Sequence, residues 1–146
     1  MGRGAKKVRI LLAEDEDLVR RLASRAFQNA GYEVVEAHDG EAALEILRQR
    51  GSEIQAIVTD VVMPKMYGPE FLRVAEEDGL GVWPVLFMSA FLSHPSRAPS
   101  ELPQGANFLK KPFTSSQLVA EFEKAIARAG LEAPRGKLLS FPANGN

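Results

Sequence analysis

The chain has 146 residues, of which 45% are apolar, and its formal net charge is −1. This composition suits one compact domain with a substantial core, excludes a disordered chain, and gives no electrostatic reason to expect direct nucleic-acid binding. The absence of cysteine excludes disulfides, thiolate metal sites and cysteine nucleophiles, and it agrees with a reducing cytoplasm. No apolar stretch approaches membrane-spanning length, and residues 1–7 lack the apolar core of a signal peptide. We therefore expect a cytoplasmic protein with a flexible basic N-terminus and no membrane partner.

Apolar runs alternate with amphipathic stretches along most of the chain, and this alternation predicts strands separated by helices. Strands are predicted at residues 8–13, 33–37, 54–60, 84–88 and 107–110. Helices are predicted at residues 17–30, 39–50 and 68–77, and in the stretch that follows residue 114. Because the strands are nearly all apolar, the pattern predicts a parallel sheet covered by helices on both faces, a three-layer α/β sandwich.

Local signals mark where the helices begin. Asp39 suits the cap of the second helix, and Pro69, directly after Gly68, suits the first turn of the third. Thr114 and Gln117 have the spacing of a capping box at the start of the last helix.

The faces of two helices can be predicted from their apolar residues. In the last helix the inward positions repeat every four residues, at Leu118, Phe122 and Ile126. In the first helix we expect inward positions at Leu18, Leu22 and Phe27. Arg20 and Arg21, between them, are expected to be ordinary solvated charges.

Two segments depart from the alternation. Residues 91–103 lie where a fourth helix is expected, but they carry Pro95, Pro99 and Pro103, and prolines at this spacing cannot lie inside a regular helix. We expect a loop there, with at most a turn or two of helix. Residues 130–146 are rich in proline and glycine and are expected to form a C-terminal tail or linker. The domain proper is then expected to span residues 8–129.

Five polar residues fall at or just after the ends of predicted strands: Glu14, Asp15, Asp60, Ser89 and Lys111. In open parallel sheets the functional residues gather at the carboxyl ends of the strands. Neighbouring carboxylates repel one another and need a proton or a cation, and oxygen ligands alone favour Mg²⁺, or Mn²⁺, over zinc. A carboxylate can also attack a phosphoryl group, whose charge Lys111 and the Ser89 hydroxyl could help to neutralise.

These residues resemble the receiver domain of two-component response regulators. The resemblance rests on Glu14-Asp15, on Asp60-x-x-Met63-Pro64-x-Met66-x-Gly68, on Ser89-Ala90 and on Lys111-Pro112-Phe113, in that order. It covers residues 8 to 129. It implies a flavodoxin-like, doubly wound sheet of five parallel strands, here with the fourth helix short or disrupted.

The resemblance also implies a role for each site residue. Asp60 would accept a phosphoryl group from a histidine kinase or a histidine phosphotransfer protein, with no catalysis beyond self-phosphorylation and self-dephosphorylation. Mg²⁺ would be held by Glu14, Asp15, Asp60 and the backbone carbonyl of Val62. Lys111 would pair with the phosphoryl group, and the Lys111–Pro112 bond is often cis in the family. Ser89 and Phe108 would act as switch residues.

Partners and lifetime follow from the same resemblance. The donor is expected to dock on the first helix near Leu18 and on the loop at Pro112 and Phe113, and the chain to be a monomer or weak dimer. Apolar residues at Val62 and Phe91 are expected to slow self-dephosphorylation, because neither can orient water. The proline-interrupted segment resembles receivers of hybrid sensor kinases, so the chain is expected to be of that type, either excised or standing alone.

Three rival functions fit the sequence less well than a receiver. A phosphorylation-independent scaffold could share the fold. An aspartate-nucleophile phosphatase typically carries a second Asp two residues after the nucleophile, where this chain has Val62. A flavodoxin would need a phosphate-binding loop after the first strand, where this chain has the acidic run Glu14 to Asp17.

Overall fold

The computed structural model describes residues 7–90, 105–131 and 133 of the chain. Its strands are β1 (Arg9–Ala13), β2 (Glu33–Ala37), β3 (Ala56–Asp60), β4 (Val85–Ser89) and β5 (Asn107–Lys110). Its helices are α1 (Asp17–Asn29), α2 (Gly40–Arg50), α3 (Gly68–Glu77) and α5 (Ser115–Arg128), with a short 3₁₀ turn, η1 (Gly51–Glu53). The prolines of residues 91–103, Phe91, most of the N-terminal segment and nearly all of the tail lie outside the described residues, so the expectations placed there stay predictions.

The five strands form one parallel sheet in the order β2-β1-β3-β4-β5. The chain moves outward from β1 to β2, then returns past β1 to β3 and continues to the other edge. The strand order therefore reverses between β1 and β3, which makes their carboxyl ends the switch point of the sheet. This is the flavodoxin-like arrangement that the resemblance implied.

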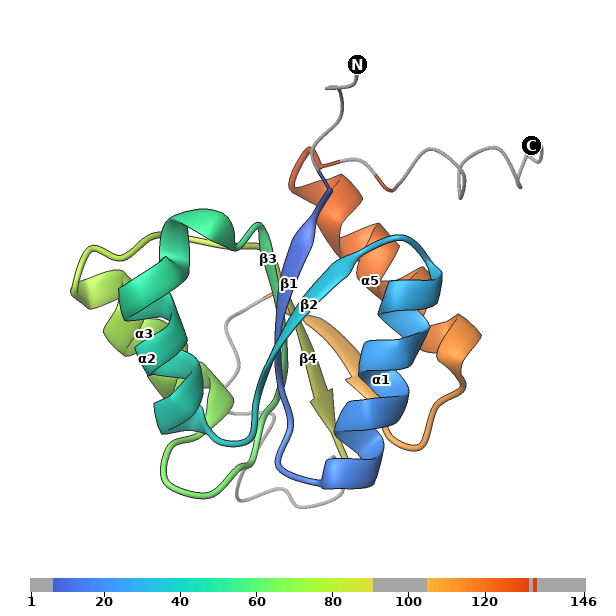
Figure 1. Cartoon of the computed structure of the whole chain (residues 1–146), viewed down its shortest axis with the longest axis horizontal. Helices are drawn as coiled ribbons and strands as arrows, with labels where there is room; N and C mark the ends of the chain where they lie inside the picture. Colours follow the sequence, from blue (N-terminus) through green and yellow to red (C-terminus); the bar gives the residue numbers. More distant parts are fainter. Residues whose placement is uncertain (1–6, 91–104, 132, 134–146) are drawn as a thin grey trace.

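Helices cover both faces of the sheet, as predicted. In Figure 1, α1 and α5 lie on one side of the strands and α2 and α3 on the other. Each side has its own apolar cluster, one around Phe27 and Phe122 and the other around Leu44 and Phe71. All five residues of β3 are buried between these two layers. Asp60, the last of them, is therefore held by a strand with little freedom to move.

The predicted helix starts are confirmed. The Asp39 carboxylate accepts a hydrogen bond of 2.7 Å from the backbone N–H of Ala42 at the start of α2. The Thr114 hydroxyl accepts from the backbone N–H of Gln117, and the Gln117 side chain accepts from that of Thr114. The predicted inward residues of α5 are all buried: Leu118, Phe122 and Ile126.

The predicted inward face of α1 is wrong at two positions. Phe27 is fully buried, but Leu18 and Leu22 are 68% and 60% exposed. A helix turns by about 100° per residue, so Leu22 lies about 140° and Leu18 about 180° around the axis from Phe27. The buried face of α1 instead contains Ala23 and Ala26. These small side chains let the helix lie close to the sheet.

Several element boundaries differ from the predictions by one or two residues. The third strand begins at Ala56, because η1 and its C-cap, Ile54, precede it. The fourth strand covers 85–89 in place of 84–88, which makes Ser89 its last residue. The predicted bounds of β2, β5 and α3 are confirmed.

Candidate functional site

The residues predicted to form the site meet at the carboxyl edge of the sheet. Glu14 and Asp15 directly follow β1, while Asp60 and Ser89 are the last residues of β3 and β4. Lys111 follows β5, and its backbone N–H donates to the Ser89 carbonyl oxygen at 3.0 Å. Parallel pairing alone brings these residues together, because it places all strand ends on the same edge.

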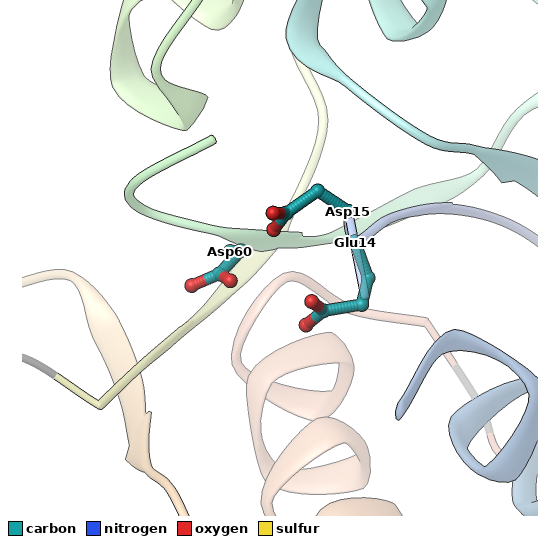
Figure 2. Close-up of side chains that lie close together, drawn as sticks. All are labelled: Glu14, Asp15 and Asp60. Atoms are coloured by element: carbon teal, nitrogen blue, oxygen red, sulfur yellow. The ribbon is translucent and has the colours of Figure 1, made fainter. Parts of the chain in front are cut away.

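Three acids form a compact cluster at this edge. One carboxylate oxygen from each of Glu14, Asp15 and Asp60 lies within 4.8 Å of the other two. Figure 2 shows the Glu14 and Asp15 side chains next to each other, with their carboxyl groups on the side where Asp60 lies. Glu14 is fully buried and Asp60 is 6% exposed, so water screens little of their mutual repulsion.

The electrostatics of Asp60 reflect this crowding. Burial, followed by the negative charge of Glu14, raises the pKa of Asp60 from 3.8 to about 7, although Lys111 acts in the opposite direction. Its surroundings therefore favour the protonated form of this carboxyl group more than water does.

Lys111 is the cation that reaches into the cluster. Its Nζ donates to Glu14 Oε1 at 2.8 Å and to Asp60 Oδ2 at 3.0 Å, and it lies 4.0 Å from Glu16 Oε1. Burial alone would lower the pKa of Lys111, but its hydrogen bonds and ion pairs with Glu14 and Asp60 outweigh burial and raise it. The ammonium group stays charged and is held beside Asp60 Oδ2.

The donor atoms of this cluster fit a hard divalent cation. All three acids offer oxygen, which Mg²⁺ and Mn²⁺ prefer, and the side-chain set contains neither histidine nor cysteine. One ammonium group faces three carboxylates, so negative charge remains for a cation to neutralise.

The two expected switch residues lie on neighbouring strands. Ser89 is fully buried at the end of β4. Phe108 lies on β5 opposite Phe87 and is partly buried in a small apolar cluster with Val61. Phe108 carries no hydroxyl group, so it can change its position only by repacking against these neighbours.

The Lys111–Pro112 peptide bond is cis, as the resemblance implied. The chain turns here from β5 into α5 and borders a groove of about 420 Å³ beside α1. Its walls include Leu22, Pro112, Phe113 and Leu118, and the Lys111 side chain contributes to its lining. Leu22, one of the two exposed leucines of α1, therefore lines a groove that Lys111 borders, rather than the core.

Arg20 was expected to be a solvated charge, and this expectation is wrong. Its side chain is 15% exposed, and its Nη1 donates to the backbone carbonyl of Glu14 at 2.8 Å. Arg21 is exposed, as expected. An arginine three residues after Asp17 is a signal for a helical ion pair, but nothing in the sequence marks the contact with Glu14.

Residues 10–123 match the family described as response regulator receiver domain, and the chain belongs to that family. It is thus a receiver domain of two-component signalling, and accepting a phosphoryl group is the function of this family. Receiver domains bind Mg²⁺ at an acidic pocket, take phosphoryl groups from histidine kinases or phosphotransfer proteins, and have weak autophosphatase activity. No helix in the described part of this chain has the length and apolar character needed to span a membrane.

The chain is similar to the sensor kinase CckA and to the receiver protein CpdR, both from Brucella abortus (strain 2308). It is 38% identical to CckA over 121 residues, which cover 82% of this chain and 12% of the kinase. It is 36% identical to CpdR, with 83% of this chain and 98% of CpdR covered. A crystal structure of the receiver domain of the hybrid histidine kinase CckA matches with a TM-score of 0.67 and 37% identity, covering 81% of this chain and 98% of that one.

Proposed function

We propose that Asp60 is the residue that accepts the phosphoryl group. The observation that carries this proposal is the position of Lys111 Nζ, 3.0 Å from Asp60 Oδ2 within a cluster of three acids. In the proposed reaction an Asp60 carboxylate oxygen attacks the phosphorus of a phosphohistidine. The P–N bond breaks, its electron pair stays on the imidazole nitrogen, and an aspartyl phosphate forms.

The charge of the transferred group must be neutralised on several sides. A bound Mg²⁺ would supply positive charge to the phosphoryl oxygens, and the residues proposed to hold it are Glu14, Asp15, Asp60 and the Val62 carbonyl. Lys111 would exchange its hydrogen bond with Asp60 for one with a phosphoryl oxygen. Its hydrogen bond with Glu14 would keep the ammonium group in place during this exchange.

We further propose that Ser89 and Phe108 convert phosphorylation into a change of shape. The modification adds about two negative charges at the end of β3. Ser89, at the end of the adjacent β4, would turn its hydroxyl toward the new group. Movement of Ser89 would shift the end of β4. Phe108 would then repack, because it pairs with Phe87 on that strand. The two states would differ in their contacts with the phosphoryl group, which is what shifts a conformational equilibrium.

The phosphohistidine donor is proposed to dock on the groove between α1 and the loop at Pro112 and Phe113. Leu18 and Leu22 are exposed on α1, and Leu22 and Phe113 line the groove. Lys111 contributes to the same groove and reaches Asp60, so a partner seated there would have the acceptor carboxylate at its edge.

The chain is proposed to be a receiver of the hybrid-kinase type, either standing alone or joined to a kinase. Its similarity to the CckA receiver supports this type. The similarity to CpdR, of which the chain covers 98%, is compatible with a separate receiver. Reading the gene and its neighbours decides between the two: a kinase core encoded upstream in the same frame would establish the hybrid form.

The phosphoacceptor proposal can be tested with acetyl phosphate as donor, with and without Mg²⁺. The expected result is a Mg²⁺-dependent gain of one phosphoryl group by intact mass, located on Asp60 by peptide mapping. Asp60→Asn should abolish the gain with the fold intact, while Asp78→Asn, which alters an exposed acid after α3, should leave it unchanged. Labelling of Asp60→Asn to the same stoichiometry would refute the assignment. Absence of labelling in the natural protein would favour a scaffold, and steady turnover of a phosphate ester would favour a phosphatase.

A further inference from the structure

Arg20 links three segments of the chain beside the acid cluster. Its Nη1 donates to the Glu14 carbonyl oxygen at 2.8 Å, its Nη2 to Asp17 Oδ1 at 2.7 Å and its Nε to Glu36 Oε1 at 3.2 Å. The guanidinium therefore joins the loop after β1, the first turn of α1 and strand β2. Its side chain is 15% exposed, whereas those of Asp17 and Glu36 are 78% and 40% exposed.

The carbonyl group that Arg20 holds belongs to the peptide between Glu14 and Asp15. A peptide unit is planar, so fixing its oxygen restrains the orientation of the whole unit and the positions of the two Cα atoms from which the flanking side chains leave. Those side chains are two of the three acids in the cluster.

Other contacts hold the same segment on its remaining sides. The backbone N–H of Glu14 donates to the Ala37 carbonyl at 3.0 Å, and Glu14 Oε2 accepts from the backbone N–H of Glu16, also at 3.0 Å. Asp15 is different, because its carboxylate makes no hydrogen bond or ion pair with any other residue that the structure describes. Its position depends on the backbone that carries it, and Arg20 is a side chain that holds that backbone.

We infer that Arg20 is a positioning residue for the divalent-cation site: its hydrogen bond to the Glu14 carbonyl sets the peptide from which the Glu14 and Asp15 carboxylates extend toward Asp60. This inference rests on the proposed Mg²⁺ site. Among the described residues, the Arg20 guanidinium bonds to Asp17, Glu36 and the Glu14 carbonyl oxygen and to none of the three clustered carboxylates, so it acts through the main chain. Arginine suits this task because its rigid, planar guanidinium can donate to three acceptors at fixed angles. Lysine offers a single ammonium group, which cannot reproduce that geometry.

The test measures Mg²⁺ affinity in the full chain by following the backbone amide signals of Asp15 and Glu16 during a Mg²⁺ titration. Arg20→Ala should weaken Mg²⁺ binding about 10-fold, the effect typical of losing a group that orients a metal ligand. Arg21→Ala is the matched control, because it removes the same charge from the adjacent, exposed position. Arg20→Lys should recover less than half of the lost binding free energy.

A second reading separates positioning from a general loss of stability. With acetyl phosphate, Arg20→Ala should raise the Mg²⁺ concentration needed for half-maximal labelling about 10-fold, while the rate at saturating Mg²⁺ stays near that of the Arg21→Ala control. A variant in which only the fraction of folded protein had fallen would show the reverse. Its maximal labelling rate would be lower, and the Mg²⁺ concentration for half-maximal labelling would be unchanged.

Glu36→Gln keeps the experiment decisive if Arg20→Ala does not fold. It weakens one partner of the guanidinium while leaving Arg20 in place, and it should give a smaller loss of Mg²⁺ affinity than Arg20→Lys. If Arg20→Ala, or both Arg20→Lys and Glu36→Gln, bind Mg²⁺ as tightly as Arg21→Ala, the positioning role is wrong while the metal site stands. If the natural protein shows no Mg²⁺ affinity, the proposed site and this inference fail together.

Discussion

The backbone of Gly68 lies directly against the carbonyl oxygen of Asp60. A Cβ added to Gly68 would be 2.4 Å from that oxygen, closer than real Cβ atoms approach any backbone atom. The backbone N–H of Gly68 also donates to the Val61 carbonyl at 2.9 Å. The start of α3 is thus packed against the strand end that carries the proposed acceptor, with no room for a side chain at the contact.

Gly68→Ala should therefore destabilise the fold by about 1–3 kcal/mol, the usual cost of forcing extra atoms into a packed site. It should also slow phosphoryl uptake, because relieving the clash must move α3 or the backbone of Asp60. Urea unfolding measures the first effect, and acetyl phosphate labelling measures the second. The matched control is Gly51→Ala, whose added Cβ would have its nearest neighbour at 3.4 Å and which should change stability little. Equal stability of the two variants would contradict the prediction.

Stability without divalent cations should fall as the pH rises from about 4 to about 7. The folded-state pKa of Asp60 is about 7, against an ordinary value of 3.8, so between these values the folded state holds a proton that the unfolded state has released. The free energy of unfolding then decreases with rising pH across this window and levels off above it. A difference of this size corresponds to at most about 4 kcal/mol.

Asp60→Asn removes this titration and should flatten the pH dependence between about pH 4 and 7. Urea unfolding in EDTA at several pH values measures the effect, and Asp78→Asn again serves as the control with an exposed acid. A steeper fall in stability for Asp60→Asn than for the natural protein would show that the sign of the shift is wrong.

Lys111→Ala should separate cation binding from the conformational response. Mg²⁺ binding is expected to remain, because the three acids are retained and the competing ammonium group is removed. The change in the backbone amide spectrum on phosphorylation should shrink to a small fraction of that in the natural protein, because no ammonium group would pair with the phosphoryl oxygens. Lys124→Ala, an exposed lysine on α5 paired with Glu121, is the control. An unchanged spectral response would mean that Lys111 is dispensable for the switch.

Replacing Val62 and Phe91 with Asn and Glu should accelerate loss of the phosphoryl group, on the order of tenfold or more, because polar side chains could orient the attacking water. Val62 is half-buried next to the end of β3. The decay of labelled protein after removal of the donor gives the rate. Val82→Asn, at a 79% exposed position, provides the control. The same decay rate in both proteins would leave the proposed cause of a long lifetime without support.

The sheet and most of the site were predictable because they depend on short-range patterns and on strand order. The apolar runs that end in Asp60 and in Glu14-Asp15 predict two strands. They also predict that these acids meet, because parallel strands have their carboxyl ends at one edge of the sheet. The caps at Asp39 and Thr114 were predictable for a related reason, because capping involves residues only three apart.

Other features depend on contacts that a linear pattern does not contain. The angular position of Leu18 and Leu22 could have been worked out from their spacing to Phe27, and apolar character alone was misleading. The burial of Arg20 could not have been predicted in this way, because it depends on a backbone carbonyl of the preceding loop and on Glu36 of strand β2. The groove at Pro112 depends likewise on the distance between α1 and α5, which tertiary packing determines.

Lys111 reaches the acid cluster from the segment after β5, which is the last of the described strands to be synthesised. A ribosome-bound chain that has emerged only as far as β4 carries every carboxylate of the cluster and lacks their counter-charge. The full conformational response to phosphorylation would then be acquired late, when β5 has joined the sheet edge. The change in amide spectrum on phosphorylation would thus also report that β5 has paired with β4, and fragments ending before residue 107 would lack it.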